Sequence, residues 1–118
     1  MEKKEILLEI TDVLHQIGMP AHVKGYHYVR EAILMVYFDS SLLDHMMGGV
    51  YRQLALRYNT SLQCVERVIR AAIEITWLRG NHEAIYKLFQ NTVDGRKARP
   101  TNKEFIALLA DYLTIKHL

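Results

Sequence analysis

Residues 58–74, YNTSLQCVERVIRAAIE, decide the fold, because a turn-forming start runs directly into an amphipathic helix. At about 3.6 residues per turn, the apolar side chains of residues 61–79 share one side of that helix. They are Val65, Val68, Ile69, Ala72, Ile73 and Thr76. The opposite side carries Gln63, Glu66, Arg67, Arg70 and Glu74. The pattern therefore predicts a helix that buries one face and presents a charged stripe on the other.

The residues before this helix have the spacing of a helix-turn-helix. The small Ala55 lies in the preceding apolar segment, and Asn59, which tolerates the left-handed conformation of a sharp turn, follows four residues later. Thr60 and Gln63 have capping-box spacing, in which the Thr60 hydroxyl accepts from the Gln63 amide and the Gln63 side chain reaches back to the Thr60 amide. We therefore predict a helix-turn-helix over about residues 50–79, with its second helix suited to the DNA major groove.

The charged stripe has the chemistry to read bases. Arg67 and Arg70 suit bidentate donation to guanine, and Glu66 suits acceptance from cytosine. Gln63 suits adenine or a phosphate. The stripe also has a plainer interpretation, because Glu66 and Arg70 form an i, i+4 pair that stabilises any exposed helix by a few tenths of a kcal/mol. The spacing alone leaves both interpretations open.

The rest of the chain repeats the helical period and shows no convincing alternation typical of a strand. The first expected helix begins at about Ile6 and ends at Gly18, and the second covers residues 26–38. A third segment is interrupted by Gly48 and Gly49 and resumes over 50–58. After the charged helix, a short helix extends from an Asn81 cap to Phe89, and the last helix follows a Thr101–Glu104 capping box. The sequence therefore predicts one domain over residues 1–118, an all-α compact bundle of about six helices.

Composition narrows the class of function. The 118 residues are half hydrophobic and carry a formal net charge of +2, so nucleic-acid contact would need local clustering of basic residues. The single cysteine, Cys64, excludes an internal disulfide, and the six histidines form no i, i+3 or i, i+4 pair, so we expect no metal and no cofactor. No apolar run reaches the ~20 residues of a membrane span, and neither an export signal nor a catalytic motif is visible. These features favour a cytoplasmic protein that is not an enzyme.

A basic cluster precedes the last predicted helix. It consists of Arg96, Lys97, Arg99 and Lys103. Backbone amides at a helix N-terminus and basic side chains together suit a phosphate, and a solvated loop is the alternative. The residue pattern leaves these two interpretations open as well.

Three ordered blocks, MPAHVKGYHYVREAILMVY, VERVIRAAIEITWLRGN and ARPTNKEFIALLAD, resemble the C-terminal effector domain of the sporulation response regulator family. The resemblance covers nearly the whole chain. It implies a six-helix domain that binds DNA as tandem protomers on a box resembling TGTCGAA, activating some promoters and repressing others. By position, Glu66, Arg67 and Arg70 match the base-facing residues. The chain departs from the family at Cys64 and Ala71, where an arginine and a histidine are frequent.

The resemblance also divides the remaining surface into expected roles. Base contacts are expected from Glu66, Arg67, Arg70 and Gln63, and phosphate contacts from Thr60, Ser61, Arg96, Lys97, Arg99 and Lys103. Residues of about 80–93 match a region that touches the RNA polymerase sigma subunit, with Gly80, His82, Lys87, Phe89 and Val93 expected to face it. The family's receiver domain has no counterpart in this sequence. The alternative function is a helical protein-interaction module without DNA binding, in which Met46 and Met47 contact a partner.

Overall fold

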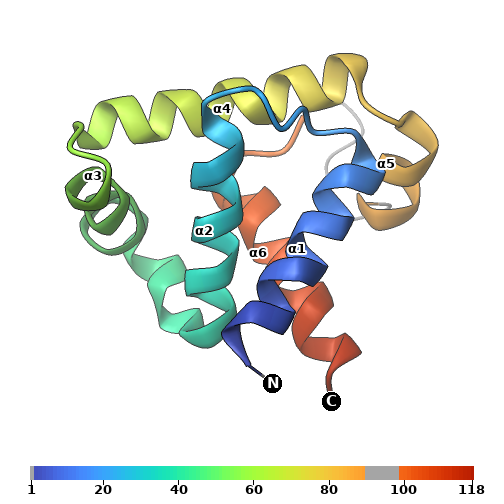
Figure 1. Ribbon diagram of the computed structural model, residues 1–118, viewed down its shortest axis with the longest axis horizontal. Coiled ribbons are helices and arrows are strands. Elements are labelled where there is room, and N and C mark those ends of the chain that lie inside the picture. The colour runs from blue at the N-terminus through green and yellow to red at the C-terminus, as the bar shows by residue number, and fades with distance from the viewer. Residues whose placement is uncertain (1, 90–98) are drawn as a thin grey trace.

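The computed structural model describes residues 2–89 and 99–118. These residues form α1 (Lys3–Ile17), α2 (Gly25–Phe38), α3 (Arg52–Arg57), α4 (Leu62–Arg79), α5 (His82–Phe89) and α6 (Asn102–Lys116). A 3-10 helix, η1 (Ser40–His45), and a π-helix, η2 (Met46–Tyr51), connect α2 to α3. The two described ranges contain no β-strand, and the predicted all-α bundle is confirmed (Figure 1).

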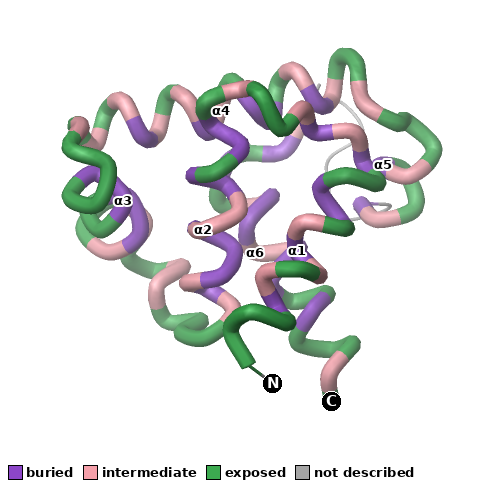
Figure 2. Tube along the Cα trace, in the orientation of Figure 1, coloured by how far each residue is buried: buried purple, intermediate pink, exposed green. Residues whose placement is uncertain are grey.

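Helix α2 is the centre of the bundle. It packs against α1, α4 and α6, and Figure 1 shows it descending from α4 between α3 and α1. Val29, Ala32 and Ile33 are completely buried, and buried positions recur along the whole helix (Figure 2). The apolar sequence of residues 26–38, expected to form the middle of the core, does so because neighbouring helices cover it on several sides.

Two glycines permit close approaches between the helices. Gly18 ends α1 with φ +84°, a left-handed conformation that most other residues avoid, and its amide donates to the His15 carbonyl. Gly25 begins α2 directly against α4, where a Cβ would overlap the Val68 carbonyl oxygen and lie 2.9 Å from the Ala72 Cβ. The absence of a side chain at Gly25 therefore sets how closely α2 meets α4.

The prediction that Gly48 and Gly49 interrupt the third segment is wrong. Both lie inside η2, so the chain stays helical from Ser40 to Arg57 while its hydrogen-bonding pattern changes from 3-10 through π to α. Wider helical turns of the π type are rare and local. Val50 and Tyr51 at the end of η2 are buried, and this anchoring to the core maintains the helical path beyond the glycines.

The beginning of α1 and the end of α6 lie together, at the side of the domain opposite α4 (Figure 1). Glu9 joins them, because its Oε1 accepts from Lys116 Nζ at 2.8 Å and its Oε2 lies 2.5 Å from His117 Nε2. The hydrogen bond from Lys116 is the main cause that lowers the pKa of the Glu9 carboxyl. This contact holds α1 and α6 together on the side of the domain away from α4.

Candidate nucleic-acid interface

The predicted helix-turn-helix is present as α3, a four-residue connection and α4. The Tyr58 amide donates to the Leu54 carbonyl at 3.0 Å, and the Thr60 amide donates to the Ala55 carbonyl at 2.9 Å. Asn59 has φ +52° and is the only non-glycine residue of the described chain with a positive φ. The small, buried Ala55 and the left-handed Asn59 therefore perform the roles that their spacing predicts.

The predicted capping box between Thr60 and Gln63 is wrong. Ser61 is the N-cap of α4, with an extended backbone, and its Oγ accepts from the Cys64 amide at 3.0 Å. The reason is that the turn already uses the Thr60 amide, which donates to Ala55, so the helix begins one residue later than its sequence suggests. The Ser61 hydroxyl still stands at the N-terminus of α4, where it can donate to a phosphate.

A polar cluster braces α3 against α2. The Glu31 carboxylate accepts from both the Arg57 guanidinium and the Tyr58 hydroxyl. The Tyr58 ring lies 4.8 Å from the Tyr28 ring, centroid to centroid. Burial, followed by the adjacent Glu31 carboxylate, raises the pKa of Tyr58 to about 12, so the hydroxyl remains a donor at neutral pH. These contacts position α3 relative to α2, and α3 in turn sets the direction in which the chain enters α4.

Helix α4 separates its two faces as predicted. Val65, Ile69, Ala72, Ile73 and Thr76 are buried, and Val68 is partly buried. On the other side, Gln63, Arg67 and Glu74 are exposed, whereas Glu66 and Arg70 are intermediate because their side chains lie against each other. The four predicted base-contacting residues therefore share the outer surface of one helix, which spans one side of the domain (Figure 1).

Opposite charges alternate along this outer surface. Arg70 Nη1 donates to both carboxylate oxygens of Glu66, at 2.7 Å to Oε2. Arg70 Nε also lies 3.9 Å from Glu74 Oε1, and Arg99 Nη2 donates to that same oxygen at 2.9 Å. The row Glu66–Arg70–Glu74–Arg99 links α4 to the segment that leads into α6. Glu66 thus pairs with Arg70 in the free protein, which is the i, i+4 contact expected from the sequence.

The N-terminus of α6 lies beside α4 at Asn102, and the next residue, Lys103, is exposed and lines a hollow with residues 42–49. Asn102 is buried, and its Nδ2 donates to the Glu66 carbonyl and to the Tyr51 hydroxyl, each at 3.1 Å. The predicted capping box is confirmed: Thr101 Oγ1 accepts from the Glu104 amide, and the Glu104 carboxylate accepts from the Thr101 amide. Asn102 was missed from the sequence, because an asparagine after a helix cap usually indicates nothing beyond the cap itself.

Lys24 is a second residue that the sequence did not single out. It precedes Gly25, whose backbone touches α4 at Val68, and its charge acts on the thiol of Cys64. A hydrogen bond from Thr60 is the main cause that lowers the pKa of Cys64, with Lys24 and Arg67 contributing. Lys24 is exposed and therefore adds positive charge beside the first turns of α4, a position that only the close contact between α2 and α4 reveals.

The residues expected to face RNA polymerase are not equivalent in the structure. His82 and Lys87 are exposed on α5, and Tyr86, which the sequence did not single out, is 70% exposed. Phe89 is buried, with its ring stacked 5.4 Å from that of Phe105, so it belongs to the core rather than to the surface. Trp77 joins this aromatic cluster, at 4.9 Å from Phe89.

Gly80, also expected at this surface, has a packing role in the structure. Gly80 has no side chain, and a Cβ there would lie 2.5 Å from the Ile17 carbonyl oxygen, so it allows α4 to end against α1. Val93 lies outside the described residues, as do Arg96 and Lys97 of the expected phosphate contacts. Asn81 caps α5 as predicted, with Oδ1 accepting from the Ala84 amide at 3.1 Å.

Within residues 2–89 and 99–118, no group of three or more histidine, cysteine or acidic side chains is arranged to hold a metal ion. In the same part of the chain, none of the helices combines the length and apolar character needed to cross a membrane.

Comparison with known families agrees with this geometry. Residues 10–113 match the family described as "Sporulation initiation factor Spo0A C terminal", a match that includes the helix-turn-helix, α5 and nearly all of α6. This is a family of transcription-factor domains rather than of enzymes. The chain belongs to the Spo0A C-terminal family, the DNA-binding effector domains of sporulation regulators.

Proposed function

We propose that this domain is a sequence-specific reader of double-stranded DNA, which inserts α4 into the major groove at a short box. Arg67 and Arg70 would contact guanines, with Glu66 orienting Arg70 and Gln63 contributing a further base or phosphate contact. Tandem protomers on adjacent boxes, acting in the bacterial cytoplasm at the chromosome, would activate or repress transcription.

The observation that carries the proposal is the placement of α4 between two other helix N-termini. The start of α2 brings Lys24 to one part of α4, and Asn102, which precedes Lys103, holds the start of α6 against Glu66. Base-reading arginines in the groove and positive charge beside it are the two contributions that specific DNA binding requires. Ser61 at the N-terminus of α4 adds a hydroxyl to the same surface.

The direct test compares box-containing with scrambled duplex at several salt concentrations. A DNA reader should prefer the box by about 10³-fold or more, and its affinity for both duplexes should fall steeply as salt rises. A protein-interaction module would show neither property. The exposed Met47, beside the hollow formed by residues 42–49 and Lys103, is then the surface at which to seek a protein partner.

The backbone contacts make a separate prediction. Lys24→Ala and Lys103→Ala should each weaken binding to box and scrambled duplexes alike, because a phosphate contact carries no sequence information. Each lost contact should reduce the slope of log affinity against log salt by about 0.9. Lys4→Ala is the matched control, since Lys4 is exposed at the start of α1, on the opposite side of the domain. An unchanged slope for Lys24→Ala would show that Lys24 does not contact a phosphate.

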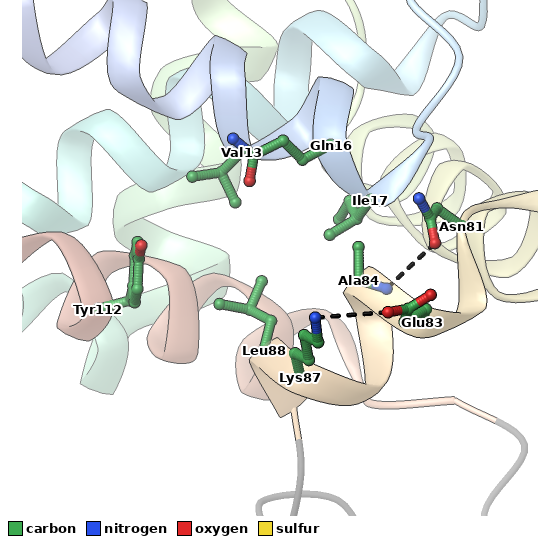
Figure 3. A pocket seen from close by; sticks show the side chains of 9 residues that line it. All are labelled: Val13, Gln16, Ile17, Asn81, Glu83, Ala84, Lys87, Leu88 and Tyr112. Atoms are coloured by element: carbon green, nitrogen blue, oxygen red, sulfur yellow. Dashed lines mark hydrogen bonds and ion pairs between the residues drawn. The ribbon is translucent and has the colours of Figure 1, made fainter.

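We further propose that α5 contacts RNA polymerase. Its exposed residues stand beside an open hollow of about 580 Å³ between α1, α5 and α6, which Figure 3 shows lined by Val13, Gln16, Ile17, Asn81, Glu83, Ala84, Lys87, Leu88 and Tyr112. Lys87 and Glu83 form an exposed ion pair at its rim, 3.4 Å between Nζ and Oε1. Helix α5 turns away from the outer face of α4, so a protein could occupy it while α4 is on DNA.

This division of surfaces predicts variants that separate binding from activation. His82→Ala and Lys87→Ala should leave box affinity within about twofold, because surface substitutions outside the interface have small effects. Transcription from a reconstituted promoter should fall by about fivefold or more if either side chain anchors the polymerase contact. Lys4→Ala again serves as the control, and loss of box affinity in parallel with transcription would contradict the separation.

A further inference from the structure

Glu74 connects two arginines with different expected roles, a base contact for Arg70 and a phosphate contact for Arg99. Its Oε1 accepts from Arg99 Nη2 at 2.9 Å and lies 3.9 Å from Arg70 Nε. Arg70 belongs to the charged stripe of α4, whereas Arg99 belongs to the segment entering α6. A single carboxylate oxygen therefore couples a proposed base contact to a proposed backbone contact.

Two carboxylates approach different nitrogens of the Arg70 guanidinium. Nη1 donates to Glu66, one helical turn before it, and Nε faces Glu74, one turn after it. Because the guanidinium is planar, the hydrogen bonds at Nη1 and the ionic attraction of Glu74 at Nε together favour one orientation of its plane. A side chain that is already oriented in the free protein loses less conformational freedom when it binds, so its contact with a base is stronger.

We propose that Glu74 is a positioning residue for sequence discrimination, which orients Arg70 and anchors Arg99 without touching a base. This inference rests on the proposed function of α4. Loss of the Glu74 contacts should loosen Arg70 and weaken binding to the box. Removal of a negative charge near the duplex should strengthen binding to any DNA. The two effects oppose each other in box affinity, but only the loss of orientation lowers the ratio of box to scrambled affinity, because the charge effect strengthens binding to both duplexes.

Three variants separate orientation from charge. Glu74→Gln removes the charge and keeps the length of the side chain, whereas Glu74→Asp keeps the charge and shortens the reach by one methylene. Glu83→Gln is the matched control, because Glu83 is an exposed carboxylate in an i, i+4 pair with Lys87 on α5. Each protein is titrated against box and scrambled duplexes by fluorescence anisotropy, with circular dichroism to confirm that the helices are intact.

Both Glu74 variants should lower the box-to-scrambled ratio by about two- to tenfold, the range expected when one long side chain loses its orientation. Glu83→Gln should leave the ratio unchanged. An unchanged ratio in Glu74→Gln would overturn the inference. A parent-like ratio in Glu74→Asp would also overturn it, because the reach of the carboxylate would then have no effect on discrimination.

A measurement without DNA keeps this inference distinct from the proposed function. The Nε–H nuclear magnetic resonance signals of Arg70 and Arg99 in the free domain should shift in both Glu74 variants and stay in place in Glu83→Gln. Unresponsive signals would overturn the coupling itself. Responsive signals in a domain whose parent form shows no preference for the box would overturn the proposed function, and with it the effect of Glu74 on discrimination.

Discussion

Replacement of Arg67 by alanine is expected to weaken binding to box DNA by about 10–100-fold, while binding to scrambled DNA falls much less. Arg67 is exposed on the first half of α4, the part of a recognition helix that leads into the groove. Its planar fork suits the O6 and N7 atoms of guanine, and one bidentate pair contributes about 1–3 kcal/mol of discrimination. Arg67→Lys should fail similarly, because a point charge cannot reproduce the fork.

The control for this experiment lies on the same helix. Arg79 is an exposed arginine in the last turn of α4, twelve residues or about 18 Å beyond Arg67. Arg79→Ala therefore removes the same charge without removing a groove contact, and its box-to-scrambled ratio should equal that of the parent. Binding is measured on both duplexes at one salt concentration. Equal ratios for Arg67→Ala and the parent, with helicity retained, would show that the stripe is only a solvated face.

Gly25→Ala is expected to lower the free energy of unfolding by about 1–3 kcal/mol, a large effect for the addition of one methyl group. The new Cβ would overlap the Val68 carbonyl oxygen, a rigid part of the α4 backbone that cannot rotate away as a side chain would. Helix α2 would have to move from α4, and because α2 is the centre of the core, the displacement would disturb its packing on α1 and α6.

Gly48→Ala provides the matched comparison. Gly48 also lies in a helical segment, but apart from the adjoining residues and the local helix backbone no atom lies within 4 Å of a Cβ placed there. Its substitution should be neutral or stabilise the domain by about 0.4–1 kcal/mol, because alanine restricts the unfolded chain. Urea unfolding followed by circular dichroism measures both variants. Equal stability of the two would show that α2 can shift on α4 without penalty.

The periodic parts of the fold could be predicted from the sequence. The buried face of α4, the left-handed Asn59, the stop at Gly18 and the capping box at Thr101 all depend on residues close to one another along the chain. Such local preferences are visible without tertiary structure. The start of α4 was missed by one residue because two hydroxyl residues stand side by side, and the choice of Ser61 over Thr60 follows from a backbone hydrogen bond to Ala55.

Contacts between distant segments could not be predicted in the same way. Asn102 lies 36 residues from the Glu66 carbonyl that it binds, and Arg99 lies 25 residues from Glu74. Periodicity assigned Phe89 to the end of a short helix but could not show that its ring stacks on Phe105. The sequence places Lys24 in a loop far from Cys64. In the folded domain it lies near Cys64, because Gly25 allows α2 to approach α4 closely.

The contact of Glu9 with Lys116 and His117 also has a practical consequence, because it keeps the two ends of the chain on one side of the domain, where a label can be attached. Since α1 begins and α6 ends on the side away from α4, a dye or surface linker attached at either end stands off from a bound duplex by roughly the depth of the bundle. If two protomers occupy neighbouring boxes, as we propose, their attachment points would lie on the sides that face away from the DNA. A donor dye on one and an acceptor on the other would then report their spacing along the DNA without occupying the surface that binds it.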